Sequence, residues 1–283
     1  MNRTSVYFSI TVAASLLLGS CAALASHPAS IDSDAEHTAL PKPEVTQLAI
    51  DEPRRVLFVG NSYFFYNDGL HSHLYRMARA AGLFETSPAM FRSSTIGGAA
   101  LRDHPMDYLL KSENLRVDAP FELVIMQGVS SAALTKNRRK FFVDAATINA
   151  RKIRMAGAQP ILYMTPAYAP AHRRYSPDMT ARIASFYIET GNELDAMVIP
   201  VGLAFQEAYR RNPDIILHKP FDSSHPDLLG TYLAAATLLA SVYGVSPVGN
   251  EYDYFGAIDP ADALFLQTVA QDTVIEFFGR SAM

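Results

Sequence analysis

Two short segments of this 283-residue chain hold residue types that together could perform acyl transfer. In the first, an apolar run ends at Gly60 and is followed by Asn61 and Ser62. In the second, Asp222 and His225 stand three residues apart in the sequence Asp-Ser-Ser-His-Pro. A serine nucleophile needs a base that takes its proton, and the base needs a group that orients it. The two segments therefore supply candidates for nucleophile, base and orienting carboxylate.

Each segment by itself also has a purely structural interpretation. A Gly-Asn-Ser turn after a strand can expose the hydroxyl and the N–H of Ser62 toward one point, but the same residues are common in ordinary turns. The Asp-x-x-His spacing lets one turn fold back, so that the carboxylate of Asp222 meets one ring nitrogen of His225 and leaves the other for a serine proton. A turn aspartate followed by a helix-capping histidine would give the same spacing.

Taken together, the two segments resemble the SGNH/GDSL hydrolases, a family of serine esterases and acylhydrolases. The resemblance runs from Val56 to about Ala236. The first block of the family, G-D/N-S, is matched at residues 60–62, and the last block, D-x-x-H-P, is matched in full at residues 222–226. The resemblance implies a flavodoxin-like three-layer α/β/α fold with a mainly parallel sheet, and a catalytic triad of Ser62, Asp222 and His225.

The resemblance also implies an oxyanion hole. The N–H of Ser62 and the N–H of a glycine after the second strand are two of its expected donors, and Gly98 aligns best with that glycine. The third block of the family, G-x-N-D, is not matched, because Gln127 follows the strand where the family has asparagine. Gln127 carries the same amide one methylene further out, so we expect it to donate. The alternatives are Gly97 in place of Gly98, and Ser130 or Ser131 in place of Gln127.

Aromatic and histidine side chains near these segments have two interpretations each. Tyr63 and Tyr66 directly follow the serine, and Tyr168 follows an apolar strand; we expect them either to line the substrate or to pack the loops. His71 and His73 are two residues apart, a spacing that points them to different sides of a helix and argues against a shared metal ion. We expect no metal and no cofactor.

The apolar segments of the chain alternate between strand-like and helix-like patterns from Arg54 onward. Strands are expected at 55–59, 121–126, 160–165 and 197–201, and helices at 70–81, 137–156, 177–194, 226–243 and 260–278. Strands separated by helices predict a parallel sheet covered on both faces. Ligands of such sheets bind outside the carboxyl ends of the strands. We therefore expect a single α/β domain over residues 54–283, with its site at residues 60–62, 95–98, 127–130 and 166–168.

The N-terminus has the features of an export signal. Arg3 precedes an apolar run over residues 6–18, which is followed by small residues. The run is shorter than the roughly 20 residues that cross a bilayer. Leu18-Gly19-Ser20-Cys21 is similar to a lipobox and predicts a signal peptide over 1–20 with lipidation of Cys21, whereas residues 23–25 form a competing site for plain secretion. Residues 21–53 are polar and contain proline, which predicts a flexible tether.

The amino-acid composition of the chain limits the kinds of molecule that it is expected to bind. With 24 Lys and Arg against 28 Asp and Glu, the formal charge of −4 gives no basis for nucleic-acid binding. Hydrophobic residues make up 49% of the chain and charged residues 18%, as in folded globular proteins. One cysteine excludes an intramolecular disulfide. We expect a small-molecule or glycan ester as substrate, and membrane contact only through a lipid on Cys21.

The expected activity is that of an exported serine esterase in the periplasm, at the cell surface or in the medium. O-deacetylation of carbohydrate is the first expectation, because an exported member of the family would meet envelope or environmental glycans. Lipid ester hydrolysis is the second. A glycan-binding lipoprotein that keeps the fold without catalysis is the third, and Gln127 is its main support. A triad by itself does not select among these substrates.

Overall fold

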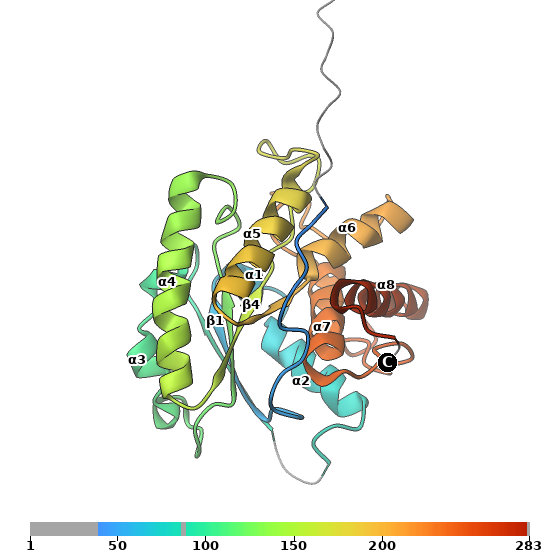
Figure 1. Ribbon diagram of the computed structural model, residues 1–283. Coiled ribbons are helices and arrows are strands. Elements are labelled where there is room, and N and C mark those ends of the chain that lie inside the picture. The colour runs from blue at the N-terminus through green and yellow to red at the C-terminus, as the bar shows by residue number, and fades with distance from the viewer. Residues whose placement is uncertain (1–38, 86–88, 282–283) are drawn as a thin grey trace, which may run out of the picture. The chain divides into compact units, whose positions relative to one another are not determined.

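The computed structural model describes residues 39–85 and 89–281 (Figure 1). The expected signal peptide, the cut before Cys21 and the first part of the expected tether lie outside these residues. Within the described ranges, none of the helices combines the length and the hydrophobicity that a membrane crossing requires.

Five parallel strands form one sheet in the order β2-β1-β3-β4-β5. They are β1 (Arg55–Gly60), β2 (Met90–Thr95), β3 (Leu123–Gln127), β4 (Gln159–Tyr163) and β5 (Met197–Ile199). Because all five run the same way, their carboxyl ends meet at one edge of the sheet. The chain moves outward from β1 to β2 and then returns to the other side of β1 with β3, so the order of the strands switches at β1, where open α/β sheets bind ligands.

Helices cover both faces of this sheet, as Figure 1 shows with α3 and α4 on one side and α2 and α7 on the other. They are α1 (Ser62–Phe65), α2 (Leu70–Ala80), α3 (Met106–Leu109), α4 (Lys136–Met155), α5 (Met179–Glu193), α6 (Val201–Arg211), α7 (Leu228–Tyr243) and α8 (Pro260–Phe278), with 3₁₀ turns at Leu101–Asp103 and Ser112–Leu115. Alternate residues of β1 point to opposite cores: Phe58 packs with α2 and α7, and Leu57 with α4 and α5. The predicted three-layer α/β/α class is confirmed.

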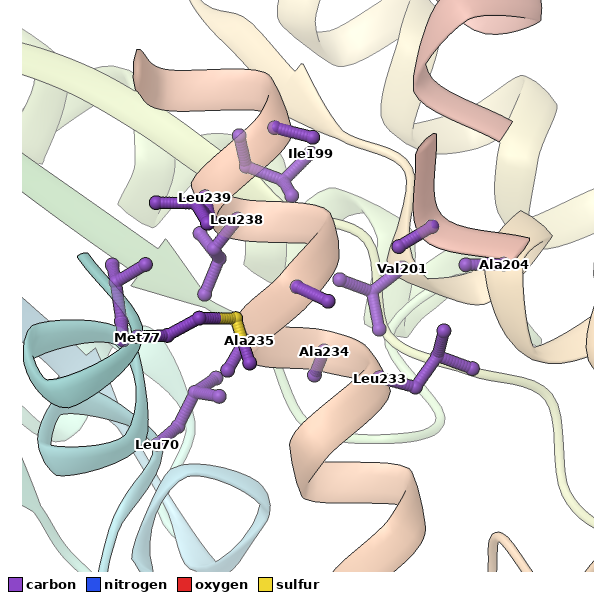
Figure 2. Close-up of a cluster of buried hydrophobic side chains, with 14 of the residues drawn as sticks. Leu70, Met77, Ile199, Val201, Ala204, Leu233, Ala234, Ala235, Leu238 and Leu239 are labelled. Carbon is purple, nitrogen blue, oxygen red and sulfur yellow. The ribbon is translucent and has the colours of Figure 1, made fainter. Parts of the chain in front are cut away.

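Helix α7 lies in the larger of the two cores (Figure 2). It carries no charged residue, and almost all of its side chains are buried because neighbouring helices and the sheet surround it. Small residues such as Ala234 and Ala235 let Leu70 and Met77 of α2 and Val201 of α6 approach closely. The helix that follows the Asp222 to His225 segment is therefore fixed by packing on several sides.

Several elements differ from the sequence prediction. Strand β2 is not among the strands expected at the start. It is a polar edge strand in which only Phe91 is buried, so its sequence shows little of the apolar and polar alternation that predicts a strand. Helix α6 begins at Val201, where a strand was expected to end, because the chain turns at Pro200. Pro226 precedes Asp227, the N-cap of α7, and is not a residue of the helix, whereas Pro260 does occupy the first turn of α8.

The expected tether over 21–53 is wrong from residue 39 onward. Residues 39–53 belong to the same compact unit as the rest of the domain. Val45 and Leu48 pack against the larger core. The guanidinium of Arg280 donates to the carbonyl of Thr46 at 2.8 Å, and the amide of Asn192 donates to the carbonyl of residue 42 at 2.9 Å. The sequence pattern missed this segment because most of its hydrogen bonds are made with residues more than a hundred positions away.

Gly230, in the first turn of α7, offers a test of this packing. A Cβ at this position would lie 2.2 Å from the carbonyl oxygen of Leu217 and 2.9 Å from the ring of Phe205. We expect Gly230→Ala to lower the free energy of unfolding by about 1–3 kcal/mol, because backbone cannot move aside as a side chain can. Denaturant unfolding measures this change, with Gly97→Ala as the control because a Cβ there meets no atom within 4 Å. Equal stability of the two variants would contradict the close approach.

Candidate active site

Ser62, His225 and Asp222 meet at the carboxyl edge of the sheet. Ser62 is the first residue of α1, two positions after the end of β1, and its Oγ lies 2.7 Å from Nε2 of His225. The other ring nitrogen, Nδ1, is hydrogen-bonded to Oδ2 of Asp222. The second carboxylate oxygen of Asp222 accepts the N–H groups of Ser224 at 2.9 Å and of His225 at 3.0 Å. One carboxylate therefore holds both the ring and the backbone of the histidine, and the ring reaches the serine.

The environment keeps the carboxyl group of Asp222 ionised. Partial burial by itself raises the pKa of Asp222, but the hydrogen bonds from the ring of His225 and from two backbone N–H groups outweigh it and place the pKa below its usual value. The ring of His225 also packs against two aromatic rings, with centroid distances of 5.3 Å to Tyr63 and 4.8 Å to Tyr66. Packing and the carboxylate together fix its orientation.

The loop that carries Asp222 and His225 is closed by backbone pairing. His218 and Pro226 form an antiparallel bridge, and the N–H of Lys219 donates to the carbonyl of His225 at 2.8 Å. The buried ring of His218 is hydrogen-bonded to the hydroxyl of Tyr209 at 2.7 Å, and burial lowers the pKa of His218 to about 4. His218 is therefore neutral at physiological pH and acts as a packed anchor of the loop.

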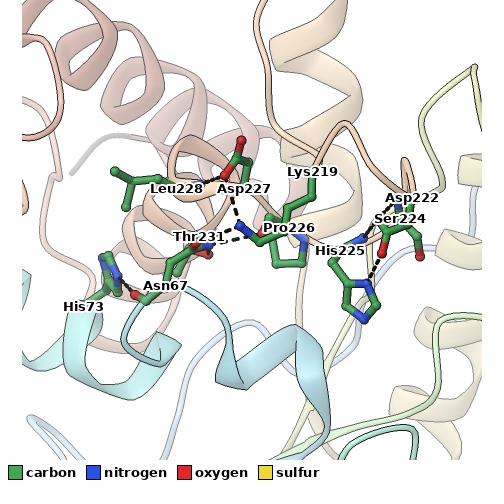
Figure 3. A network of polar contacts seen from close by, with 10 residues as sticks. All are labelled: Asn67, His73, Lys219, Asp222, Ser224, His225, Pro226, Asp227, Leu228 and Thr231. Atoms are coloured by element: carbon green, nitrogen blue, oxygen red, sulfur yellow. Dashed lines mark hydrogen bonds and ion pairs between the residues drawn. The ribbon is translucent and has the colours of Figure 1, made fainter.

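A polar network joins the serine segment to this loop (Figure 3). The side-chain amide of Asn67 donates to the carbonyl of Pro226 at 3.1 Å and to the hydroxyl of Thr231 at 2.7 Å, and its oxygen accepts from Lys219 at 3.2 Å. Lys219 also forms an ion pair of 3.2 Å with Asp227. Sequence analysis missed this network. Its local signal was weak: the Asn-Asp-Gly turn that places Asn67 at a positive φ of 56°.

Gln127 is not an oxyanion donor, contrary to expectation. Its side chain is fully buried, and its amide nitrogen donates to Oδ1 of Asn61 at 2.9 Å and to the carbonyl of Gly128 at 2.6 Å. Its amide oxygen accepts the N–H of Asn61 at 3.1 Å. Both ends of the amide are occupied by the turn behind the serine, so none of its hydrogens points to a substrate.

Asn61 connects three strand ends. Besides its bonds to Gln127, its amide nitrogen donates to the carbonyls of Ala99 at 3.1 Å and Gly128 at 3.4 Å. The loops after β2 and β3 are thus held on either side of Ser62. Among the described residues, none of the N–H groups of Ser62, Gly97 and Gly98 donates to a protein group. These three backbone groups therefore remain candidate oxyanion donors. Gly98 is exposed and has a φ of 72°, a conformation that favours glycine.

Two of the three tyrosines expected at the substrate surface are buried. Tyr63 and Tyr168 are only 4% and 5% exposed. The hydroxyl of Tyr63 shares a hydrogen bond of 2.7 Å with Ser224, and that of Tyr168 one of 2.9 Å with Ser130. They therefore support the loops around the site. Tyr66 is half-buried and lines a cavity of about 410 Å³ beside α1.

The two histidines after the serine segment have packing contacts. His73 is buried, with its ring nitrogens hydrogen-bonded to the carbonyl of Asn67 at 2.6 Å and the hydroxyl of Tyr252 at 3.1 Å. His71 lies beside Gly69 and the cavity that Tyr66 lines. In the part of the chain that the structure describes, no cluster of three or more His, Cys, Asp or Glu could hold a metal ion.

Comparison with known proteins gives the fold a name. No protein-family model matches the sequence, and no curated protein does. Among solved structures, a DUF4886 family protein from Bacteroides uniformis has a TM-score of 0.60 at 17% identity, over 81% of this chain and 96% of its own. A protein from Slackia heliotrinireducens assigned to the SGNH hydrolases has a TM-score of 0.54 at 24% identity, over 67% of this chain and 98% of its own. This chain has the SGNH hydrolase fold.

A third similar structure carries the same fold. It is an acetylxylan esterase from Geobacillus stearothermophilus, with a TM-score of 0.52 at 13% identity, over 69% of this chain and 96% of its own. The resemblance noted from the Gly-Asn-Ser and Asp-x-x-His-Pro segments is confirmed at the level of the fold. The SGNH fold explains why two segments 160 residues apart meet, since both lie at the carboxyl edge of one parallel sheet.

The role of Gln127 can be tested by removing its amide. Gln127→Ala leaves the buried N–H of Asn61 without an acceptor, so we expect the free energy of unfolding to fall by about 1–3 kcal/mol for that group. Denaturant unfolding measures the loss. Ser130→Ala, which removes a hydroxyl at the same strand end, is the matched control and should cost less. An unchanged stability together with slower ester hydrolysis would instead assign the amide to the oxyanion.

Proposed function

We propose that this protein is a serine esterase that hydrolyses carboxylic esters. The observation that carries the proposal is the continuous hydrogen-bonded chain from Ser62 Oγ to His225 Nε2 at 2.7 Å and from His225 Nδ1 to Asp222. A serine, an imidazole and a carboxylate in this order form the arrangement that activates a hydroxyl for acyl transfer. The SGNH fold, with the serine in the turn that follows its first strand, supports the proposal.

The reaction follows from these contacts. His225 takes the proton of Ser62 as its oxygen attacks the ester carbonyl, and Asp222 stabilises the resulting imidazolium. The backbone N–H groups of Ser62 and Gly98 stabilise the oxyanion. His225 then gives its proton to the departing alcohol, which leaves an acyl-serine. A water molecule, deprotonated by His225, attacks the acyl-serine and releases the carboxylic acid.

We propose that the ester is an O-acetyl group on carbohydrate. Support comes from one similar enzyme, whose structures in two mutant forms are described as those of an acetylxylan esterase and of an acetyl-xylooligosaccharide esterase. The alternative of a binding protein that keeps the fold without catalysis loses its main support, because Gln127 is engaged in holding the Asn61 turn and is not a damaged oxyanion donor.

Replacement of the serine tests the proposed activity. We expect Ser62→Ala to slow the hydrolysis of p-nitrophenyl acetate by about 10⁴-fold or more, and to abolish labelling by a fluorophosphonate, because both need the Ser62 oxygen. Ser72→Ala, ten residues further along, is the control and should keep both. A folded wild-type protein that neither hydrolyses the ester nor takes up the label would refute the esterase.

We further propose that the protein is exported and carries a lipid on Cys21, on the sequence pattern of residues 1–21 alone. Lipidation would place the enzyme at a membrane surface facing external glycans. Expression in a bacterial host, membrane fractionation and mass spectrometry of the mature N-terminus measure this. A lipidated N-terminal peptide that begins at Cys21 and disappears in Cys21→Ala is the expected result. A soluble protein that begins after Ala25 would show plain secretion.

A further inference from the structure

A cavity of about 200 Å³ lies between the loops that follow β2 and β3. Its lining is Ala100, Leu101, Arg102, Val129, Ala132, Arg138, Phe141 and Phe142. Neither the triad nor the oxyanion groups contribute to it. We call this cavity the arginine subsite, after the two guanidinium groups in its lining.

The arginine subsite directly adjoins the serine turn. Asn61, the neighbour of the nucleophile, donates to the carbonyls of Ala99 and Gly128. The next residue in each loop, Ala100 or Val129, lines the subsite. The subsite therefore lies next to the turn that carries Ser62.

The lining is apolar on the inside and basic at the mouth. Leu101, Ala132 and Phe142 are buried, whereas Arg102 and Arg138 are exposed. Phe142 packs so closely against Gly128 that a Cβ there would lie 2.8 Å from its ring, which fixes the inner wall.

The two guanidinium groups are positioned but not neutralised by close ion pairs. That of Arg102 lies 4.6 Å from the ring centre of Phe141, and its ion pair with Asp103 is long, at 3.8 Å. Arg138 donates to the hydroxyl of Ser131. Within the described ranges, Arg138 forms no ion pair. Both guanidinium groups are therefore available to bind an anion at the mouth of the subsite.

The charges around the arginine subsite also favour the binding of an anion. The segments 96–103 and 128–142, which follow β2 and β3 and contain the lining of the subsite, hold five Lys and Arg but one Asp, in a chain whose formal charge is −4. On the opposite side of the nucleophile, Asp222 and Asp227 are paired with His225 and Lys219. The edge of the sheet that holds the subsite is therefore locally basic and attracts anionic molecules.

We propose that the arginine subsite binds a carboxylate-bearing sugar, so that the ester cleaved at Ser62 belongs to an acidic, uronate-containing glycan. The inference rests on the proposed esterase function and specifies its substrate class. Guanidinium groups bind carboxylates through paired hydrogen bonds, and the apolar inner wall accepts the C–H face of a sugar ring. The cavity is smaller than the roughly 300–1,000 Å³ of common ligand pockets, which suits one sugar unit and not a long acyl chain.

The test compares three esters of different charge and size. These are O-acetylated polygalacturonate, O-acetylated xylan of equal acetyl content, and p-nitrophenyl acetate as the small neutral reference. We expect kcat/KM for acetate release to be about tenfold or more higher on the acidic polymer than on xylan. Raising NaCl to about 0.5 M should shrink this preference, because salt screens the arginines. An equal rate on both polymers, or a preference for xylan, would overturn the proposal.

Variants of the two arginines locate the effect. We expect Arg138→Ala and Arg102→Ala each to lower the ratio of kcat/KM on acetylated polygalacturonate to that on p-nitrophenyl acetate by about tenfold, and Arg138→Lys to restore part of it. Arg151→Ala, an exposed arginine further along α4, is the matched control and should leave the ratio unchanged. A loss of equal size on both substrates would show a structural role only.

A binding measurement separates this inference from the proposed function. Calorimetry with trigalacturonate measures the subsite without catalysis. Binding to the wild-type protein that weakens in Arg138→Ala would uphold the subsite, even if no ester were hydrolysed and the esterase proposal failed. No binding of trigalacturonate to a wild-type protein that hydrolyses p-nitrophenyl acetate would overturn the subsite and leave the esterase standing.

Discussion

The buried pair of side-chain amides formed by Asn61 and Gln127 is the contact on which the geometry of the site depends. Buried polar groups are costly when unpaired, so each hydrogen bond of this pair is strongly favoured over its absence. Through them, the end of β1 is joined to the end of β3 and, through Ala99, to the loop after β2. Ser62 stands in the middle of these three attachments. Its position is set by the sheet, and the neighbouring loops are set relative to it.

The histidine side of the site is fixed by different physics. Asp222 and His225 lie on a loop that ends at α7, a helix without charges that is packed on nearly all sides. Movement of this helix would disrupt the packing of the larger core, so the loop attached to the helix is held in place by that packing. Asn67 and Lys219 then add polar contacts that join the loop to the serine segment. Apolar packing sets the coarse position of the histidine, and hydrogen bonds set the final distance.

The distribution of charge differs between the two sides of Ser62. On the side of the histidine loop, acidic and basic groups neutralise one another in short contacts. On the side of α4, the arginines pack on rings and hydroxyls. The overall charge of the chain is mildly acidic and hides this asymmetry, because many acidic residues lie away from the carboxyl edge of the sheet. The positive charge around the arginine subsite is therefore a property of one edge of the fold and does not follow from composition.

Sequence patterns alone predict the alternation of strands and helices, the parallel sheet and the two segments that carry Ser62, Asp222 and His225. These features depend on local patterns: apolar runs of strand or helix length, and an Asp-x-x-His spacing that a single turn can close. Three other features emerge only in the folded chain: Gln127 faces Asn61, Tyr63 and Tyr168 are buried, and residues 39–53 pack on the domain. The partners of these residues lie tens to hundreds of positions away, and a local pattern contains no information about which distant surface a side chain will meet.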